Sequence, residues 1–327
     1  MITIINFLFA AIKAGTPLLF GTTGEIMTEK TGNLNLGVEG IMYMGAFIGF
    51  FVGYTTNSLV LALIAAFAIG AFAALIYTFL TVSLQANQNV TGLALTTFGT
   101  GFANFFGELL ISHSDGVSPK LSAEFSAKLN EISIPLLGDI PYIGKVLFSH
   151  NILVYFGIVV ALIAWIYMKF TRPGLRMRAV GENPAAADAS GINVNRAKYI
   201  HILVGGGICA LGGAYISLIN GNGVWNNGCV NGQGWISVAL VIFASWSPAK
   251  AIFGSLVFGA FSVFQVRAGD FATAFPFLGF LSYIPNAIYV MLPFLVTALV
   301  LIISSMRQKK EGTQPTACGV NYYREER

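Results

Sequence analysis

Charged residues are scarce in this sequence. Asp, Glu, Lys and Arg together make up 10% of its 327 residues, whereas hydrophobic residues make up 55%, and the mean hydropathy is +0.73. Soluble globular domains carry about 25% charged residues, so this composition excludes a soluble fold. Because one helical crossing of a bilayer needs roughly 20 apolar residues, the composition predicts a polytopic membrane protein.

Cysteine and histidine are also few. The three cysteines and three histidines are widely spaced, which excludes a disulfide framework, a zinc ribbon and a His-Glu-x-x-His metal site. The net charge of +4 is small, and the basic residues do not form a patch with interleaved aromatic residues of the kind that binds nucleic acid. We therefore expect no bound metal, no redox chemistry and no nucleic-acid partner.

Enzyme motifs are missing as well. Neither G-x-S-x-G nor the phosphate-binding G-x-x-x-x-G-K-[ST] occurs. Ser247-Pro248-Ala249-Lys250 matches S-x-x-K, but S-D-N and K-T-G do not accompany it, as they do in the enzymes that use this motif. We expect no catalytic residues and no cofactor bound by this chain, so any ATP must be bound by another subunit.

Apolar runs are the main feature that is present. Pro276, Pro285 and Pro293 must kink or divide the last of them. The runs predict an all-α bundle of about 8–10 transmembrane segments in a single domain over residues 1–327. They cover residues 14–26, 36–54, 58–82, 88–111, 150–170, 199–220, 234–247, 249–268 and 272–303.

The distribution of charge predicts the orientation. Residues 169–199 contain six basic and two acidic residues, and short loops this basic stay in the cytoplasm. We therefore expect a cytoplasmic loop at 171–198. Alternation of the spans then places the loop at 112–149 and the stretch 220–233 outside, and the tail at 304–327, including the carboxyl terminus, in the cytoplasm.

The amino end allows two interpretations. A lysine in the middle of a membrane span is costly, and Lys13 would be central in one span from residue 4 to 26. We expect residues 2–12 to form an interfacial helix, followed by a crossing that is broken around Gly32–Gly37, with both termini cytoplasmic. The alternative is a nine-span topology with the amino end outside.

Small residues recur at helical spacing in two spans, as Gly45, Gly49 and Gly53 and as Gly206, Ala210 and Ala214. Such patterns let helix backbones approach closely. We expect them to pack helices within the chain rather than to form a dimer interface.

Polar side chains interrupt three otherwise apolar regions, at 32–40, at 85–92 and at Asn104 with Glu108. Polar groups inside a membrane protein face a water-filled path or hold helices together, and the sequence leaves both roles open. Glycines at 32–40 permit a helix break that would expose helix ends to a ligand. The candidate passage residues are Asn33, Asn35, Glu39, Gln85, Asn87 and Asn89.

The loop at 171–198 contains signals for a short helix. Asn183 followed by Pro184 is typical of an N-cap and first helical residue, three alanines favour helix, and Gly191 is a typical stop. This helix would lie along the membrane face, either to bind a partner or only as part of a topology-setting loop.

Two long motifs resemble one family. Gly181–Ile192, G-E-N-P-A-A-A-D-A-S-G-I, resembles the coupling-helix motif of permease subunits in bacterial ATP-binding-cassette importers of the ribose and branched-chain amino acid type. Gly24–Met42 is similar to the branch of that family that imports nucleosides and related simple sugars. Further matches are Gln88–Leu95, Gly234–Leu240 and the tail Tyr322–Arg327.

The resemblance implies a multi-pass permease in the bacterial cell membrane, surrounded by lipid, that is not itself an enzyme. Its implied partners are a cytoplasmic ATP-binding subunit, a second and somewhat longer permease that makes a heterodimer, and an extracytoplasmic substrate-binding lipoprotein. The residues implied to contact the ATPase are Arg176, Arg178, Gly181, Glu182, Asn183, Ala186, Ala187, Gly191 and Ile192.

The sequence leaves open two substrate classes for an importer and one different transport mechanism. Amide side chains suit a neutral nucleoside, because they both donate and accept hydrogen bonds, and we expect nucleoside uptake first. Ribose or another simple sugar is the alternative within the same family. An ion-coupled secondary transporter that uses Glu39 and Glu108 is the alternative from another class.

Overall fold

The computed structural model describes residues 2–114, 116–133, 143–274, 284–307 and 313–323, with the single positions 138, 140 and 279. Strands β1 (Ile132–Ser133) and β2 (Ser149–His150) form one short antiparallel pair. The fold is otherwise helical, which confirms the expected all-α bundle. In chain order the helices are α1 (Ile2–Glu29), α2 (Val38–Thr56), α3 (Leu59–Thr78) with the π-helical turn η1 (Phe79–Ser83), α4 (Gln88–Ser112), α5 (Ala123–Lys128), α6 (Ile143–Phe148), α7 (Ile152–Phe170), α8 (Arg172–Glu182), α9 (Pro184–Ala189), α10 (Val194–Tyr215) with the π-helical turn η2 (Ile216–Asn220), α11 (Gln233–Phe243), α12 (Pro248–Ala274) and α13 (Asn286–Arg307).

The helices match the apolar runs of the sequence. Five of them, α1, α2, α3 with η1, α7 and α10 with η2, are long and apolar enough to cross a membrane, and shorter apolar helices lie in α11, α12 and α13. Helix α12 ends at Ala274 and α13 begins directly after Pro285, so the last run is divided as its prolines predict. Pro276 lies outside the described residues.

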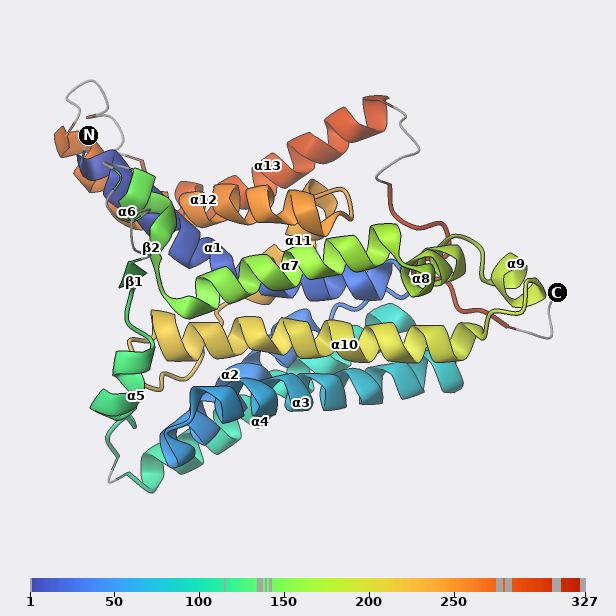
Figure 1. Ribbon diagram of the computed structural model, residues 1–327, viewed down its shortest axis with the longest axis horizontal. Coiled ribbons are helices and arrows are strands. Elements are labelled where there is room, and N and C mark those ends of the chain that lie inside the picture. Colours follow the sequence, from blue (N-terminus) through green and yellow to red (C-terminus); the bar gives the residue numbers. More distant parts are fainter. Residues whose placement is uncertain are drawn as a thin grey trace.

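Helix α10 lies at the centre of the bundle, with α1 and α7 on one side and α2, α3 and α4 on the other (Figure 1). Its small residues are in close backbone contact with three neighbours. A Cβ added at Gly45 of α2 would overlap the backbone of Ala210, and one added at Gly70 of α3 would overlap that of Gly206. The small-residue patterns therefore pack helices within the chain, as expected.

Helix α1 is one continuous helix, and the expectation of a separate interfacial helix over residues 2–12 is wrong. Its amino end lies against the loop that precedes α7, where Lys145 Nζ donates to Asn6 Oδ1 at 2.9 Å and Phe9 stacks on His150. Its carboxyl end reaches α8, since a Cβ on Gly181 would overlap the carbonyl of Lys30, which follows α1. The start of α1 and the segment 313–323 thus lie at opposite ends of the bundle (Figure 1), an arrangement that favours the alternative with the amino end outside.

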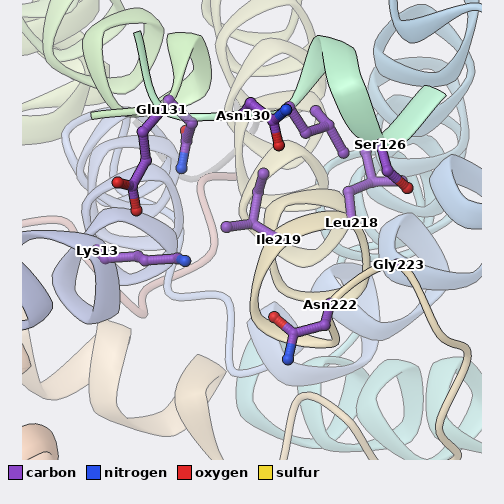
Figure 2. A pocket seen from close by; sticks show the side chains of 10 residues that line it. Lys13, Ser126, Asn130, Glu131, Leu218, Ile219, Asn222 and Gly223 are labelled. Carbon is purple, nitrogen blue, oxygen red and sulfur yellow. The ribbon is translucent and has the colours of Figure 1, made fainter. Parts of the chain in front are cut away.

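The position of Lys13 explains this difference. Lys13 lines a pocket of about 450 Å³ at the amino-terminal end of α7. Figure 2 shows Lys13 and Glu131 on one side of this pocket and Ser126 and Asn222 on the other. Lys13 therefore lies beside polar side chains rather than only apolar ones, and no helix break is needed to accommodate its charge.

The break after α1 is confirmed. Residues 30–37 are not helical, Gly32 has a φ of +87°, and α2 begins at Val38. A positive φ is easily adopted only by glycine, so Gly32 permits the reversal of the chain between α1 and α2.

The close packing of α10 leads to a stability prediction. A Cβ on Gly213 would overlap the carbonyl of Met42, whereas one on Gly101 of α4 meets nothing within 4 Å. We expect Gly213→Ala to destabilise the protein by about 1–3 kcal/mol through overpacking, and Gly101→Ala to leave stability unchanged or raise it by up to about 1 kcal/mol. Thermal unfolding of both purified variants in detergent measures this, and equal midpoints would contradict the packing described.

Candidate functional site

The break between α1 and α2 is buried, and its backbone is bonded to other segments. The N–H of Asn35 donates to Glu25 Oε1 at 3.0 Å, and the hydroxyl of Tyr77 donates to the carbonyl of Leu34 at 2.7 Å. The side chain of Asn35 accepts from the N–H of Gly37 at 2.8 Å. These bonds supply the partners that a helix would otherwise provide in a membrane interior.

Asn33 is completely buried beside this backbone. Its Nδ2 donates to Thr81 Oγ1 at 3.4 Å, while Asn33 Oδ1 and Glu25 Oε2 have no hydrogen-bond partner among the described residues. Buried polar atoms without protein partners are usually satisfied by water or a ligand. The break therefore keeps two acceptors available, and the role of Asn33 and Asn35 in a passage stays a prediction.

Glu39 lies at the start of α2 and accepts two backbone hydrogen bonds from the start of α11. The N–H of Gly232 donates to Oε1 at 2.7 Å and that of Gly234 to Oε2 at 2.6 Å. A carboxylate at a helix amino terminus satisfies unpaired N–H groups and favours the helix dipole. Glu39 thus joins α2 to α11 and the loop that precedes it.

The other three candidate passage residues lie after η1, where the chain turns into α4. Asn87 is the N-cap of α4, with its Oδ1 accepting from the N–H of Val90 at 3.0 Å. Asn87 and Asn89 are exposed, and Gln85 is half-buried. The six candidates therefore do not meet at one point.

Gln88, which the sequence analysis did not select, connects the two groups. Its Oε1 accepts from the N–H of Leu34 at 2.8 Å, and its Nε2 donates to Asn321 Oδ1 at 2.9 Å. It lies in the same polar run as Gln85 and Asn89, but only the fold shows that this member of the run is buried. Gln88 links the break to the carboxyl-terminal segment.

Helix α9 forms as its sequence signals predict. Asn183 Oδ1 accepts from the N–H of Ala186 at 3.0 Å, Pro184 is the first helical residue, and Gly191 has a φ of +81°. The N–H of Ile192 donates to the carbonyl of Ala187 at 3.0 Å, the bond expected at a glycine-terminated helix end. The result is a short, well-capped helix at the end of the bundle opposite the amino terminus (Figure 1).

The residues implied to contact an ATPase divide into two groups. Gly181 and Ala187 are buried inside the chain, against the backbone of Lys30 and against Val180 and Val194 respectively. Glu182 accepts from the hydroxyl of Thr316 at 3.0 Å. Arg178 and Ile192 are half-buried, while Arg176, Glu182, Asn183, Ala186 and Gly191 are exposed.

The segment 313–323 lies across this face, a contact that the sequence did not predict. Asn321 Nδ2 donates to the carbonyls of Gln85 at 2.6 Å and Ala86 at 3.1 Å, and the hydroxyl of Tyr322 donates to Asp188 at 2.9 Å. The N–H of Ala317 donates to the carbonyl of Gly181 at 3.0 Å. The carboxyl-terminal segment therefore ties α8 and α9 to the start of α4. The rest of the tail expected at 304–327, residues 308–312 and 324–327, lies outside the described residues.

This docking predicts a measurable protection of Cys318. Burial raises the pKa of the half-buried Cys318 thiol to about 12, so the thiol stays protonated and unreactive at neutral pH. Asn321→Ala removes three hydrogen bonds that hold the segment. We expect alkylation of Cys318 to become about tenfold faster, because the released thiol regains an ordinary pKa.

Tyr323→Ala is the matched control, because Tyr323 is 43% exposed. Mass spectrometry of the Cys318 peptide gives the rate in each variant. An Asn321→Ala rate equal to that of the wild type would show that the segment is held by other contacts.

Comparison with known proteins identifies the family. The model of the branched-chain amino acid transport system permease component matches residues 7–306. The chain is 32% identical to the putative glucose ABC transporter permease protein TsgC13 of Haloferax volcanii, over 98% of each chain. It is 34% identical to the nucleoside ABC transporter permease protein NupC of Lactococcus lactis, over 94% of this chain and 93% of the relative.

It is also 33% identical to the guanosine ABC transporter permease protein NupQ of Bacillus subtilis, over 89% of each chain. A second permease of that organism, NupP, is 23% identical over 79% of this chain and 73% of the relative. No solved structure matches significantly. The chain belongs to the permease component family of the branched-chain amino acid transport system, and is a permease of the ABC transporter class.

Proposed function

We propose that this permease forms the membrane passage of an ATP-driven importer of nucleosides, with ATP hydrolysed on a separate subunit. The observation that carries the proposal is α9, a capped helix that presents Asn183, Ala186 and Gly191 to solvent at one end of an apolar bundle. Such a helix offers a small, rigid surface to a cytoplasmic partner. The chain has no phosphate-binding motif of its own, so ATP would act through this contact.

The choice of nucleosides rests on the relatives and on the polar chemistry of the bundle. NupC and NupQ, whose names specify a nucleoside and guanosine, align with most of this chain. The amides at the break suit a neutral, hydrogen-bonding substrate. The name of TsgC13 specifies glucose, so a simple sugar is the second candidate.

The remaining partners follow from the same comparison. Bacillus subtilis has a second, less similar guanosine permease protein, NupP, in addition to NupQ, which supports a heterodimer of two permeases. The end of the bundle that carries α5, β1 and β2 lies opposite α9 (Figure 1), and a substrate-binding lipoprotein would bind there. The carboxyl terminus and α9 would then both lie in the cytoplasm.

Coupling through α9 is tested with the exposed Ala186. We expect Ala186→Arg to leave the complex assembled but to reduce substrate-stimulated ATP hydrolysis at least about tenfold, because a bulky charge would block a close contact. Val117→Arg is the matched control, since Val117 is 68% exposed and precedes α5 at the other end. Gly181→Arg and Ala187→Glu are unsuitable tests, because both residues are packed inside the chain.

The substrate is tested by uptake into vesicles that contain the whole complex. We expect ATP-dependent uptake of labelled guanosine, inosine or uridine, with glucose and ribose taken up at least about tenfold more slowly. Sugar uptake without nucleoside uptake would assign the second candidate. Uptake driven by an ion gradient without ATP would contradict the importer itself.

A further inference from the structure

Helix α4 carries an exposed polar stripe that the interactions described so far do not explain. Thr97, Gly101, Asn104 and Glu108 are all exposed and follow one another at spacings of four, three and four residues, which places them on one face of the helix. The opposite face is buried against the rest of the bundle, through residues such as Gly99 and Ala103. The stripe extends over three turns of a helix that lies among membrane-spanning neighbours.

The glycine in this stripe packs against none of the residues that the structure describes. Every other glycine of α4 lies close to another segment. A Cβ on Gly92 would come too close to Leu36, one on Gly99 to Gly40, and one on Gly107 to Asn227. A Cβ on Gly101 meets nothing within 4 Å. Since glycine destabilises a helix relative to alanine, its presence indicates that clearance is needed on the outer side of α4.

Two side chains of the stripe are held in place by other elements. The hydroxyl of Tyr43 in α2 donates to Asn104 Oδ1, and Asn227 Nδ2 donates to Glu108 Oε1. Each bond leaves the other polar atom of the acceptor residue available, so Asn104 Nδ2 and Glu108 Oε2 have no partner among the described residues. The stripe thus presents an oriented donor and an oriented acceptor.

Aromatic rings border the same face. Phe98 and Phe105 are 52% and 65% exposed. With Ala94, Thr97 and Gly101 they line an open groove of about 640 Å³. Flat apolar surfaces next to hydrogen-bonding groups suit a ligand with a planar ring and hydroxyl groups.

We propose that this face of α4 is a wall of the substrate passage, with Gly101 in the middle of that wall. In lipid, an exposed amide and carboxylate would be strongly unfavourable, so the stripe must face water or polar protein. A nucleoside would donate ribose hydroxyls to Glu108, accept from Asn104, and place its base over Phe98 or Phe105. This assignment rests on the proposed transport function and adds the residues that contact the substrate.

A bulky side chain at position 101 provides the first test. Gly101→Trp finds open space in the chain itself, so the complex should assemble, and we expect uptake to fall at least about tenfold because the passage is blocked. Ile64→Trp is the control, since Ile64 is an apolar side chain on α3 that is 59% exposed. Wild-type uptake by assembled Gly101→Trp would overturn the proposal.

Thiol labelling gives a second test that does not depend on transport. In a background of Cys209→Ala, Cys229→Ser and Cys318→Ser, Gly101→Cys should react with a positively charged methanethiosulfonate reagent at least about tenfold faster than Ile64→Cys, because a thiolate forms in water and not in lipid. We expect guanosine to slow the reaction of Gly101→Cys. Equal rates at the two positions, or no effect of a nucleoside that the complex transports, would contradict the passage wall.

The two tests separate this assignment from the proposed function. If the wild-type complex takes up no nucleoside, the proposed function fails, and labelling at Gly101→Cys still reports whether the stripe faces water. If nucleosides are transported but Gly101→Cys behaves as Ile64→Cys does, only the assignment of α4 fails.

Discussion

The N–H and C=O groups of residues 30–37 are mostly buried and lie outside any helix, so they need hydrogen-bond partners from other segments. Much of the structure depends on which side chains supply these partners. Glu25 accepts from the break, Tyr77 donates to it, and Gln88 accepts from it. Each of these side chains comes from a different helix. Buried backbone groups outside a helix need other protein partners, so the break brings α1, α3 and α4 into one polar layer.

This polar layer is continuous with the end of the bundle that carries α8 and α9. Gln88 bonds both the break and Asn321, and the segment that contains Asn321 also bonds Asp188 and Glu182. Gly181 packs directly on the backbone of Lys30. A displacement of α9 would therefore act on the break through two routes, one through the end of α1 and one through the carboxyl-terminal segment. Because these segments are joined by hydrogen bonds and close packing, we expect α8, α9, the break and the carboxyl-terminal segment to move together.

Local signals in the sequence predicted the elements that depend on local chemistry. Asn183, Pro184 and Gly191 predicted both ends of α9. The prolines of the last apolar run predicted that it is kinked or divided, and α13 begins directly after one of them, Pro285, while Pro293 lies inside it. The error at α1 has a different origin. The cost of Lys13 depends on its depth in the membrane, and depth is set by the neighbouring loop and α7, which no local pattern reveals.

The candidate functional residues were harder to predict, because their burial also depends on tertiary neighbours that no local pattern reveals. The motif Gly181–Ile192 contains residues that pack inside the chain, such as Gly181 and Ala187, and residues that face outward, such as Ala186. A motif alone does not distinguish them, because a six-residue helix shows too few turns for its buried face to be recognised. The contact of Asn321 with Gln85 joins residues more than two hundred positions apart, and it depends on tertiary structure only.

If the exposed stripe of α4 is a passage wall, as we propose, one chain does not enclose the passage. In a single permease chain surrounded by lipid, Asn104 and Glu108 would face lipid, which is unfavourable. Neither the break nor Glu39 covers these two side chains. A second permease placed opposite α4 would remove this cost and enclose a water-filled space between the two subunits. In this arrangement the passage is a property of the pair, whereas α9 and the polar layer that it contacts belong to each chain. The stability of the assembled pair and the polarity of its passage would then depend on the same face of α4.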